Sequence, residues 1–234
     1  MSGKLWSPSE ASGGAGLRVA VIDSGVAPGH PHVGALACGI SLVGDDRADT
    51  VDRLGHGTAV AAAIREKLPE ATLVPVRVLD RTLATSARML ADAIVWAVED
   101  GARLVNLSLG TRNAVHVPIF EAALSAALVR GALVVSAYDD GEVQWYPGSL
   151  AGVLGVVVDP SCPRFSLAVS ASADGPVGAS PWPRPIPGVA AERNLSGVSF
   201  AVANATGLIG RLLGARPELR TADEIRQVAS GSMR

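Results

Sequence analysis

The stretch Ser196-Gly-Val-Ser-Phe-Ala-Val-Ala-Asn-Ala-Thr-Gly207 is the part of the sequence around which the chain is organised. Gly197 relaxes the backbone just before Ser199, and the small residues that follow allow a helix to pack deep inside a core. The first N–H groups of such a helix have no helical partner, so they favour negative charge developing near Ser199. Alone, the stretch is typical of a packed helix start, and the nucleophile hypothesis needs support elsewhere in the chain.

The composition predicts one compact α/β domain, with residues 1–16 as a lead-in and residues 17–234 as the domain. The chain has 234 residues, 48% of them hydrophobic and 18% charged, which is enough to bury a sizeable core. Twenty basic and 22 acidic residues give a net charge of −2, which offers no electrostatic argument for nucleic acid or an anionic membrane as partner. We therefore expect the partner to bind in a cleft; the oligomeric state stays open.

The N-terminus lacks an apolar core of signal-peptide length, and the apolar runs further along are too short to span a bilayer. These features predict a cytoplasmic protein. In a reducing compartment, Cys38 and Cys162 are expected to be two buried thiols rather than a disulfide.

Strand and helix patterns alternate regularly through the middle of the chain. Apolar runs predict strands of a parallel sheet that is buried on both faces, and glycines close the helices between them. The predicted strands are 17–22, 72–79, 103–109, 132–137 and 152–158, and the predicted helices are 84–100 and 117–130. Residues 160–187 predict surface hairpins and loops, and a capping box at Thr221-Ala-Asp-Glu224 predicts a C-terminal helix.

Two polar residues stand at the ends of predicted elements. Asp23 follows the first strand, at the edge where parallel sheets carry their active sites, although an aspartate there can also simply begin a turn. His56 lies between two glycines at the head of an alanine-rich helix, which makes it a candidate base.

Two other polar segments predict no site. His30 and His32 flank a proline near Asp23, but two histidines without a clear third ligand indicate loop residues rather than a metal site. The aspartate-rich residues 44–53 predict an exposed loop.

The order Asp23, His56, Ser199 and the sequence around each residue resemble the three catalytic blocks of the subtilase family of serine peptidases. The blocks are Val21-Ile-Asp-Ser-Gly-Val26, Gly55-His-Gly-Thr-Ala-Val-Ala61 and Gly197-Val-Ser-Phe-Ala201. In addition, Val105-Asn-Leu-Ser-Leu-Gly110 resembles the family's edge segment that pairs with substrate backbone. Tyr146-Pro-Gly148 resembles the strand that borders the pocket for the residue before the scissile bond. The likeness covers roughly residues 17 to 230.

The resemblance implies an α/β, subtilisin-like three-layer fold with a mostly parallel central sheet covered by helices on both faces. It implies a serine endopeptidase in which Ser199 attacks a peptide carbonyl, His56 moves the proton and Asp23 orients the imidazole. A peptide or protein substrate would bind as an extended strand. The implied substrate-binding residues are Ser108, Leu109, Gly110, Ala137, Trp145 and Tyr146.

The sequence departs from the family pattern near the predicted oxyanion site. Ala137-Tyr-Asp-Asp-Gly141 replaces an Ala-Gly-Asn-x-Gly loop, so Asp139 stands where an asparagine would donate a hydrogen bond. An ionised carboxylate facing an oxyanion is repulsive, and it helps only if burial keeps it protonated. Val198 replaces the family's usual threonine, which removes another hydroxyl near the oxyanion and also predicts weaker stabilisation of it. Ala203-Asn204 replaces proline and histidine, a change that we expect to be tolerated.

Trp145 stands where many subtilases carry a small residue at the floor of the specificity pocket. An indole there would narrow or fill the pocket and favour a small side chain. Alternatively, a shortened loop shifts the register and Trp145 packs in the core.

Cofactors and a folding segment are not expected. Because His32 occupies a position from which family calcium sites often draw an aspartate, we expect neither a metal cofactor nor calcium dependence. Fewer than twenty residues precede the first predicted strand, where many secreted subtilases carry a long folding segment, so we expect an intracellular form.

These observations favour an endopeptidase of narrow specificity, such as one that processes a peptide or precursor. Two alternatives stay open: a transpeptidase or macrocyclase whose acyl-enzyme is intercepted by an amine, and a catalytically weakened subtilase-fold protein that binds peptides.

Overall fold

The computed structural model describes residues 4–8, 12–81, 84–139, 141–170, 172, 174–190 and 193–232. Their strands form one nine-stranded sheet in the order β1-β8-β9-β7-β6-β5-β2-β4-β3. The strands are β1 (Lys4–Trp6), β2 (Arg18–Asp23), β3 (Ile40–Ser41), β4 (Thr72–Arg77), β5 (Leu104–Leu107), β6 (Leu133–Ala137), β7 (Val153–Val158), β8 (Leu167–Val169) and β9 (Val177–Ala179). The pairs from β3 through β7 to β9 are parallel, while β8 pairs antiparallel with β9 and with β1.

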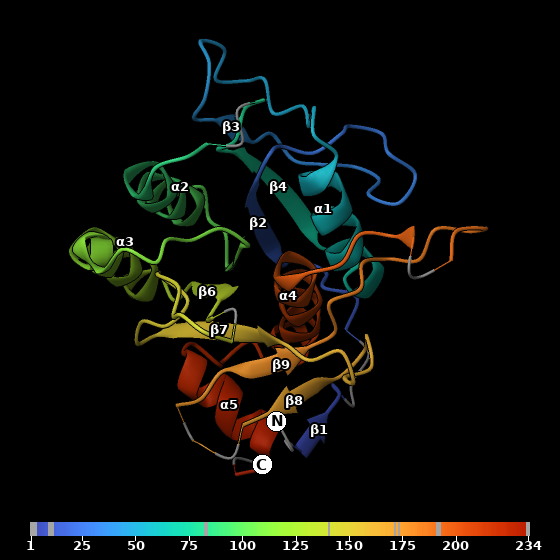
Figure 1. The fold of residues 1–234 in the computed structure, drawn as a ribbon, viewed down its shortest axis with the longest axis vertical. Coiled ribbons are helices and arrows are strands. Elements are labelled where there is room, and N and C mark those ends of the chain that lie inside the picture. The colour runs from blue at the N-terminus through green and yellow to red at the C-terminus, as the bar shows by residue number, and fades with distance from the viewer. Residues whose placement is uncertain are drawn as a thin grey trace.

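Helices cover both faces of the sheet, as predicted (Figure 1). They are α1 (His56–Lys67), α2 (Ala87–Glu99), α3 (Val117–Val129), α4 (Val198–Ala215) and α5 (Ala222–Ser230). One core packs α1, α4 and α5 against one face, and a second core packs α2 and α3 against the other. The two cores explain the almost uninterrupted apolar strands, because each strand buries side chains on both of its faces.

The predicted alternation of strands and helices is confirmed, with element ends that differ by up to three residues. The capping box is also present: Thr221 Oγ1 accepts a hydrogen bond from the Glu224 N–H, and the Glu224 carboxylate accepts one from the Thr221 N–H. Within the predicted lead-in, β1 adds a strand to the sheet beside β8.

Two expectations from the sequence are wrong. Residues 160–187 are not all surface hairpins and loops, because β8 and β9 are buried strands of the central sheet. Their three-residue length explains the weak signal, since so short a strand shows no clear periodicity. The two cysteines are free, but only Cys162 is buried; Cys38 is exposed.

Helix α4 carries the stretch that begins at Gly197, and it runs through the middle of the molecule in Figure 1. Its 18 residues are long and apolar enough to cross a membrane by length and composition alone, but 72% of them are buried inside the protein. The helix therefore has the properties of a core helix. Its small residues allow this depth: a Cβ added at Gly210 would lie 2.3 Å from a methyl carbon of Leu68 in the neighbouring chain segment.

Candidate active site

Asp23 and His56 form a hydrogen-bonded pair at the carboxyl edge of the sheet. Asp23 is the last residue of β2, a central strand, and it is fully buried. Its Oδ1 lies 2.7 Å from His56 Nδ1 and also accepts a hydrogen bond of 2.8 Å from the Ser24 N–H. This contact assigns the proton to Nδ1, which leaves Nε2 able to accept a proton from another group.

The surroundings of His56 favour its charged form. The hydrogen bond that His56 Nδ1 donates to Asp23 raises the pKa of His56, burial opposes that rise, and the negative charges of Asp23 and Asp52 add to it. The pKa of His56 therefore lies above its ordinary value of 6.5. A base of this kind accepts a proton readily at neutral pH and holds the cation that results.

Ser199 is the second residue of α4, as the sequence predicts. Gly197, which precedes the helix, has a φ of 146°, a conformation that side-chain-bearing residues rarely adopt. Phe200, the residue after Ser199, has its ring centroid 5.8 Å from that of the His56 imidazole, so the starts of α1 and α4 lie close together. Among the described hydrogen bonds, none joins Ser199 Oγ to His56; catalytic hydrogen bonds are often longer without substrate.

A buried polar chain fixes α4 against β5. Thr206 Oγ1 donates to Asn106 Oδ1 at 2.9 Å, and Asn106 Nδ2 donates to Ser108 Oγ at 3.2 Å. Ser108 Oγ in turn donates to the backbone oxygen of Ser199 at 3.4 Å. The predicted edge segment 108–110 therefore begins directly beside the candidate nucleophile.

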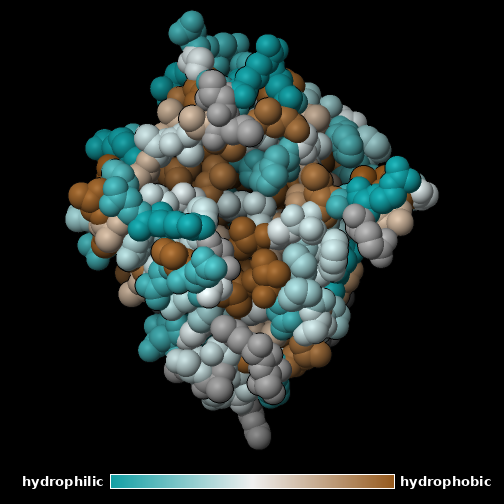
Figure 2. Space-filling view, in the orientation of Figure 1, coloured by the Kyte–Doolittle hydropathy of each residue, from teal (hydrophilic) through white to brown (hydrophobic). Residues whose placement is uncertain are grey.

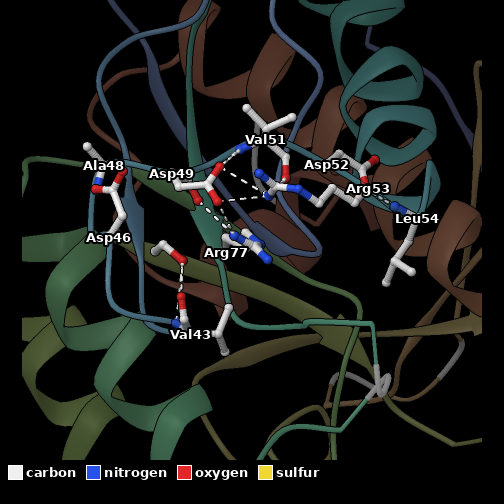
Figure 3. A network of polar contacts seen from close by, with 10 residues as sticks. Val43, Asp46, Ala48, Asp49, Val51, Asp52, Arg53, Leu54 and Arg77 are labelled. Carbon is white, nitrogen blue, oxygen red and sulfur yellow. Dashed lines mark hydrogen bonds and ion pairs between the residues drawn. The ribbon is translucent and has the colours of Figure 1, made fainter.

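Asp52 is a residue of the candidate site that the sequence interpretation missed, because residues 44–53 were expected to be an exposed loop. Its carboxylate is half-buried and accepts hydrogen bonds from Ser24 Oγ, from the N–H groups of Leu54 and Gly55, and from both the N–H and the hydroxyl of Thr58. Figure 3 shows Asp52 beside the start of α1. Burial works against the ionised form, but the bonds from Thr58, Leu54 and Gly55 outweigh it and lower the pKa of Asp52.

Asp52 thereby joins the two segments that carry Asp23 and His56. Ser24 follows Asp23, and its hydroxyl also accepts the Gly57 N–H at 3.0 Å. Thr58 lies two residues after His56, and its hydroxyl accepts the Ala27 N–H at 2.9 Å. The only sequence signal for this role is an aspartate four residues before the helix start, a position from which side chains cap backbone N–H groups.

The rest of the aspartate-rich loop is held by arginines (Figure 3). The Arg77 guanidinium, at the end of β4, donates to the backbone oxygen and to the carboxylate of Asp49 at 3.1 and 2.9 Å. Arg53 donates to Asp49 as well, at 3.1 Å. These hydrogen bonds tie the loop to the sheet.

Asp139 lies at the end of β6, where an oxyanion donor was expected. Its Oδ1 accepts a hydrogen bond of 3.1 Å from the Gly141 N–H, and its backbone forms a short antiparallel bridge with Gln144. Ala137 lies two residues before Asp139, and its backbone oxygen packs closely against Gly148. A Cβ added at Gly148 would lie 1.7 Å from that oxygen. The carboxylate thus acts as an acceptor inside its own turn.

Trp145 and Tyr146 border the edge segment. Tyr146 exchanges two backbone hydrogen bonds with Thr111, of 2.8 and 2.9 Å, just beyond Gly110. The Trp145 ring lies against Gly110, where an added Cβ would be 3.4 Å from the ring, and the Arg112 guanidinium stacks 5.0 Å from the ring centre. Trp145 is half-buried and belongs to neither hydrophobic core.

His30 and His32 lie together, with ring centroids 5.4 Å apart. Burial lowers the pKa of His32, as do the positive charge of Arg184 and the neighbouring His30. Within the described part of the chain, no group of three or more histidine, cysteine, aspartate or glutamate side chains is arranged to hold a metal ion.

Comparison with known proteins connects this geometry to a family. The model of the subtilase family matches residues 14–180. A thermophilic serine proteinase of Bacillus sp. strain AK1 is 33% identical over 157 residues, which are 62% of this chain and 38% of that protein. The chain thus spans well under half the length of this curated relative.

Two solved structures show the same fold. A lanthipeptide protease superposes with a TM-score of 0.74 at 18% identity, over 93% of this chain and 80% of the other. The prenylagaramide maturation protease PagA superposes with a TM-score of 0.67 at 26% identity, over 90% of this chain and 80% of the other.

Proposed function

Because the chain belongs to the subtilase family, we propose that it is a serine-type endopeptidase that uses Asp23, His56 and Ser199 as a catalytic triad. The observation that carries this proposal is the 2.7 Å contact between Asp23 and His56 beside the start of α4. A carboxylate, an imidazole and a serine at a helix start are the three groups that acyl transfer at neutral pH requires.

In the proposed mechanism, Ser199 Oγ attacks the scissile carbonyl while His56 Nε2 takes its proton. The tetrahedral intermediate collapses, the C–N bond breaks, and His56 returns the proton to the departing amine. Water then attacks the acyl-enzyme in the same way and releases the acid. Asp23 keeps Nδ1 protonated and stabilises the imidazolium throughout. The oxyanion is bound mainly by the backbone N–H of Ser199.

We further propose narrow specificity, directed at a peptide precursor with a small residue before the scissile bond. The extended substrate would pair with Ser108, Leu109 and Gly110, where Trp145 occupies space that a larger side chain would need. The 26% identity to PagA, a protein named as a maturation protease, supports precursor processing.

A second candidate is a subtilase-fold protein that binds peptides and has lost most of its turnover. Asp139 favours this candidate, since a carboxylate in its own turn offers no hydrogen to an oxyanion. In subtilisin, losing the one side-chain donor at this place costs about 10²- to 10³-fold in kcat.

A fluorophosphonate probe tests the proposal, since it labels only an activated serine. We expect labelling of the folded protein and none of Ser199→Ala; equal labelling of the two would reject Ser199. Mass spectrometry of the products from candidate precursors then separates hydrolysis from transpeptidation, because a transpeptidase or macrocyclase yields ligated or cyclic peptides.

Asp139→Asn separates a weak enzyme from a binder. If the triad works, the amide adds a donor and kcat rises about tenfold or more. Asp159→Asn is the matched control, because Asp159 also accepts an N–H two residues on, from Ser161, but lies outside the site. A kcat that falls in Asp139→Asn would show that the carboxylate has a positive role.

A further inference from the structure

A pocket of about 560 Å³ lies beside the candidate active site and has no role in the mechanism above. Its walls come from the start of α1 with Asp52 before it, from the loop after β2, and from residues 183–186 and 193–195, which precede α4. Gly55 lines it one residue before His56, and Leu195 lines it four residues before Ser199. Figure 1 shows the orange segment before α4, which includes residues 183–190, extending beside α1.

The pocket and the edge segment 108–110 belong to different elements around the starts of α1 and α4. Residues 108–110 approach Ser199 from β5, through the contact of Ser108 with the Ser199 backbone. The pocket is lined by the first turns of α1, the helix that begins at His56. A peptide whose acyl half pairs with residues 108–110 would continue past His56 toward α1, whose first turns line this pocket. Figure 2 shows apolar side chains, in brown, gathered at the centre of this face.

The loop that closes the pocket has a fixed base. The buried Asn204 of α4 donates to the backbone oxygens of Ser180 and Trp182 at 2.8 and 2.9 Å, and the Gly197 N–H donates to the Pro181 oxygen at 3.1 Å. Further out, Arg184 donates to the backbone oxygen of His32 at 3.0 Å, which joins the loop to the opposite wall. The pocket is thus built into the fold.

The lining combines an apolar wall with a basic rim. Alanines of α1, together with Ile186 and Leu195, form the wall, and these two larger side chains are 45% and 53% exposed. The charged side chains of the lining are Arg184, Arg193 and Asp52. The carboxylate of Asp52 is occupied by its hydrogen bonds to Ser24, Thr58 and the backbone of the α1 start, so the two arginines dominate the rim.

We propose that this pocket receives the leaving half of the substrate, with an apolar side chain against Leu195 and an acidic residue beside Arg184 and Arg193. The inference rests on the proposed peptidase function and names its substrate class: peptides with an apolar and then an acidic residue after the scissile bond. The apolar wall supplies burial, and the rim supplies charge complementarity.

The test uses peptides with one common acyl half that ends in alanine and with Leu-Glu or Leu-Lys after the scissile bond. An ester of the same acyl half, which places nothing in the pocket, reports the chemistry alone. We expect kcat/KM to be about fivefold higher for Leu-Glu than for Leu-Lys, the effect of one close charge pair in water. Arg193→Glu should remove or reverse this preference, with the kcat/KM of each peptide divided by that of the ester for the same variant so that any effect on the chemistry cancels. The control Arg88→Glu, on the exposed face of α2, should keep the preference.

A measurement of peptide binding tests the pocket without requiring that the peptide is cleaved. Fluorescence polarisation with Ser199→Ala measures the affinity of both labelled peptides without cleavage, and we expect the same preference, lost in Ser199→Ala/Arg193→Glu. Equal binding of the two peptides would overturn the inference and leave the proposed function standing if the ester is cleaved. A binding preference without cleavage of any substrate would support the pocket and overturn the peptidase function.

Discussion

At the scale of single residues, Lys67 is the side chain whose environment departs most from its ordinary one. It ends α1 with a fully buried side chain, whose Nζ lies 4.6 Å from the centre of the Phe165 ring and 3.2 Å from Glu66 Oε2. Gly207 of α4 makes room for it, since a Cβ there would lie 2.7 Å from Lys67 Cδ. Burial lowers the pKa of Lys67 to about 8, although Glu66 opposes the shift and Arg164 and Arg211 add to it.

The lowered pKa predicts a stability that rises with pH. Above pH 8 the folded chain has released the Lys67 proton, whereas the unfolded chain holds it up to about pH 10.5. Between pH 7 and 9 the free energy of unfolding should therefore rise by about 1 kcal/mol relative to Lys67→Met. Urea unfolding at both pH values measures the difference, and Lys4→Met, at an exposed lysine, should show none. A constant difference between the native protein and Lys67→Met would contradict the prediction.

A second prediction at this scale concerns Asp52 and the pH dependence of activity. Catalysis requires neutral His56, so kcat/KM should fall on the acid side with a pKa above 6.5. Asp52→Asn removes one of the charges that raise the pKa of His56, and we therefore expect the acid limb to move to lower pH.

The same substitution weakens the hydrogen bonds that the Asp52 carboxylate accepts from Ser24 and from Thr58 of α1. The free energy of unfolding should therefore fall by about 1–3 kcal/mol. Asp46→Asn is the control: it changes an aspartate of the same loop whose carboxylate accepts only a local N–H, from Ala48. An unchanged acid limb in Asp52→Asn would mean that Asp52 acts on the structure alone.

At the scale of elements, the start of α1 tolerates no added volume. A Cβ at Gly57 would lie 2.1 Å from the backbone oxygen of Gly25 and 3.1 Å from Asp23 Cβ. Gly57→Ala must therefore push α1 away from the end of β2. We expect a loss of about 1–3 kcal/mol in the free energy of unfolding, together with a lower kcat/KM, because His56 moves with the helix.

Gly13→Ala is the matched control, because its Cβ would meet only the movable end of the Glu70 side chain. Unfolding curves and peptide hydrolysis of both variants check the prediction. If Gly57→Ala loses stability but keeps full kcat/KM, the position of His56 does not depend on this contact.

At the scale of the whole molecule, internal ion pairs connect distant segments of the fold. Arg77 ties residues 44–53 to β4, and Arg164 pairs with Glu66 to tie residues 160–166 to α1. We expect Arg77→Met to lower the free energy of unfolding by about 1–2 kcal/mol. We also expect EDTA to leave Tm unchanged, because Arg53 and Arg77 already bind the Asp49 carboxylate.

Calorimetry with and without EDTA measures both effects, and Arg88→Met, at an exposed pair on α2, is the control. A Tm that falls in EDTA and recovers with calcium would contradict the expectation.

Much of the fold was predictable because its signals are local. Strands buried on both faces are continuous apolar runs, helix ends are marked by glycines or by a capping box, and Asp23, His56 and Ser199 each lie at an element end. The short strands β8 and β9 escaped prediction, since three residues carry no period and their burial depends on neighbours in the sheet.

The sequence by itself determined the α/β class and the order of the longer strands and helices, because these depend on neighbours along the chain, and its resemblance to the subtilase blocks indicated the three candidate catalytic residues. Only the tertiary structure decided what surrounds Ser199. The Ser24–Asp52 hydrogen bond joins residues 28 apart, Ser108 reaches Ser199 across 91 residues, and Arg184 reaches His32 across 152. Such contacts form when the sheet brings distant segments to one edge, and no local pattern records which side chains meet there.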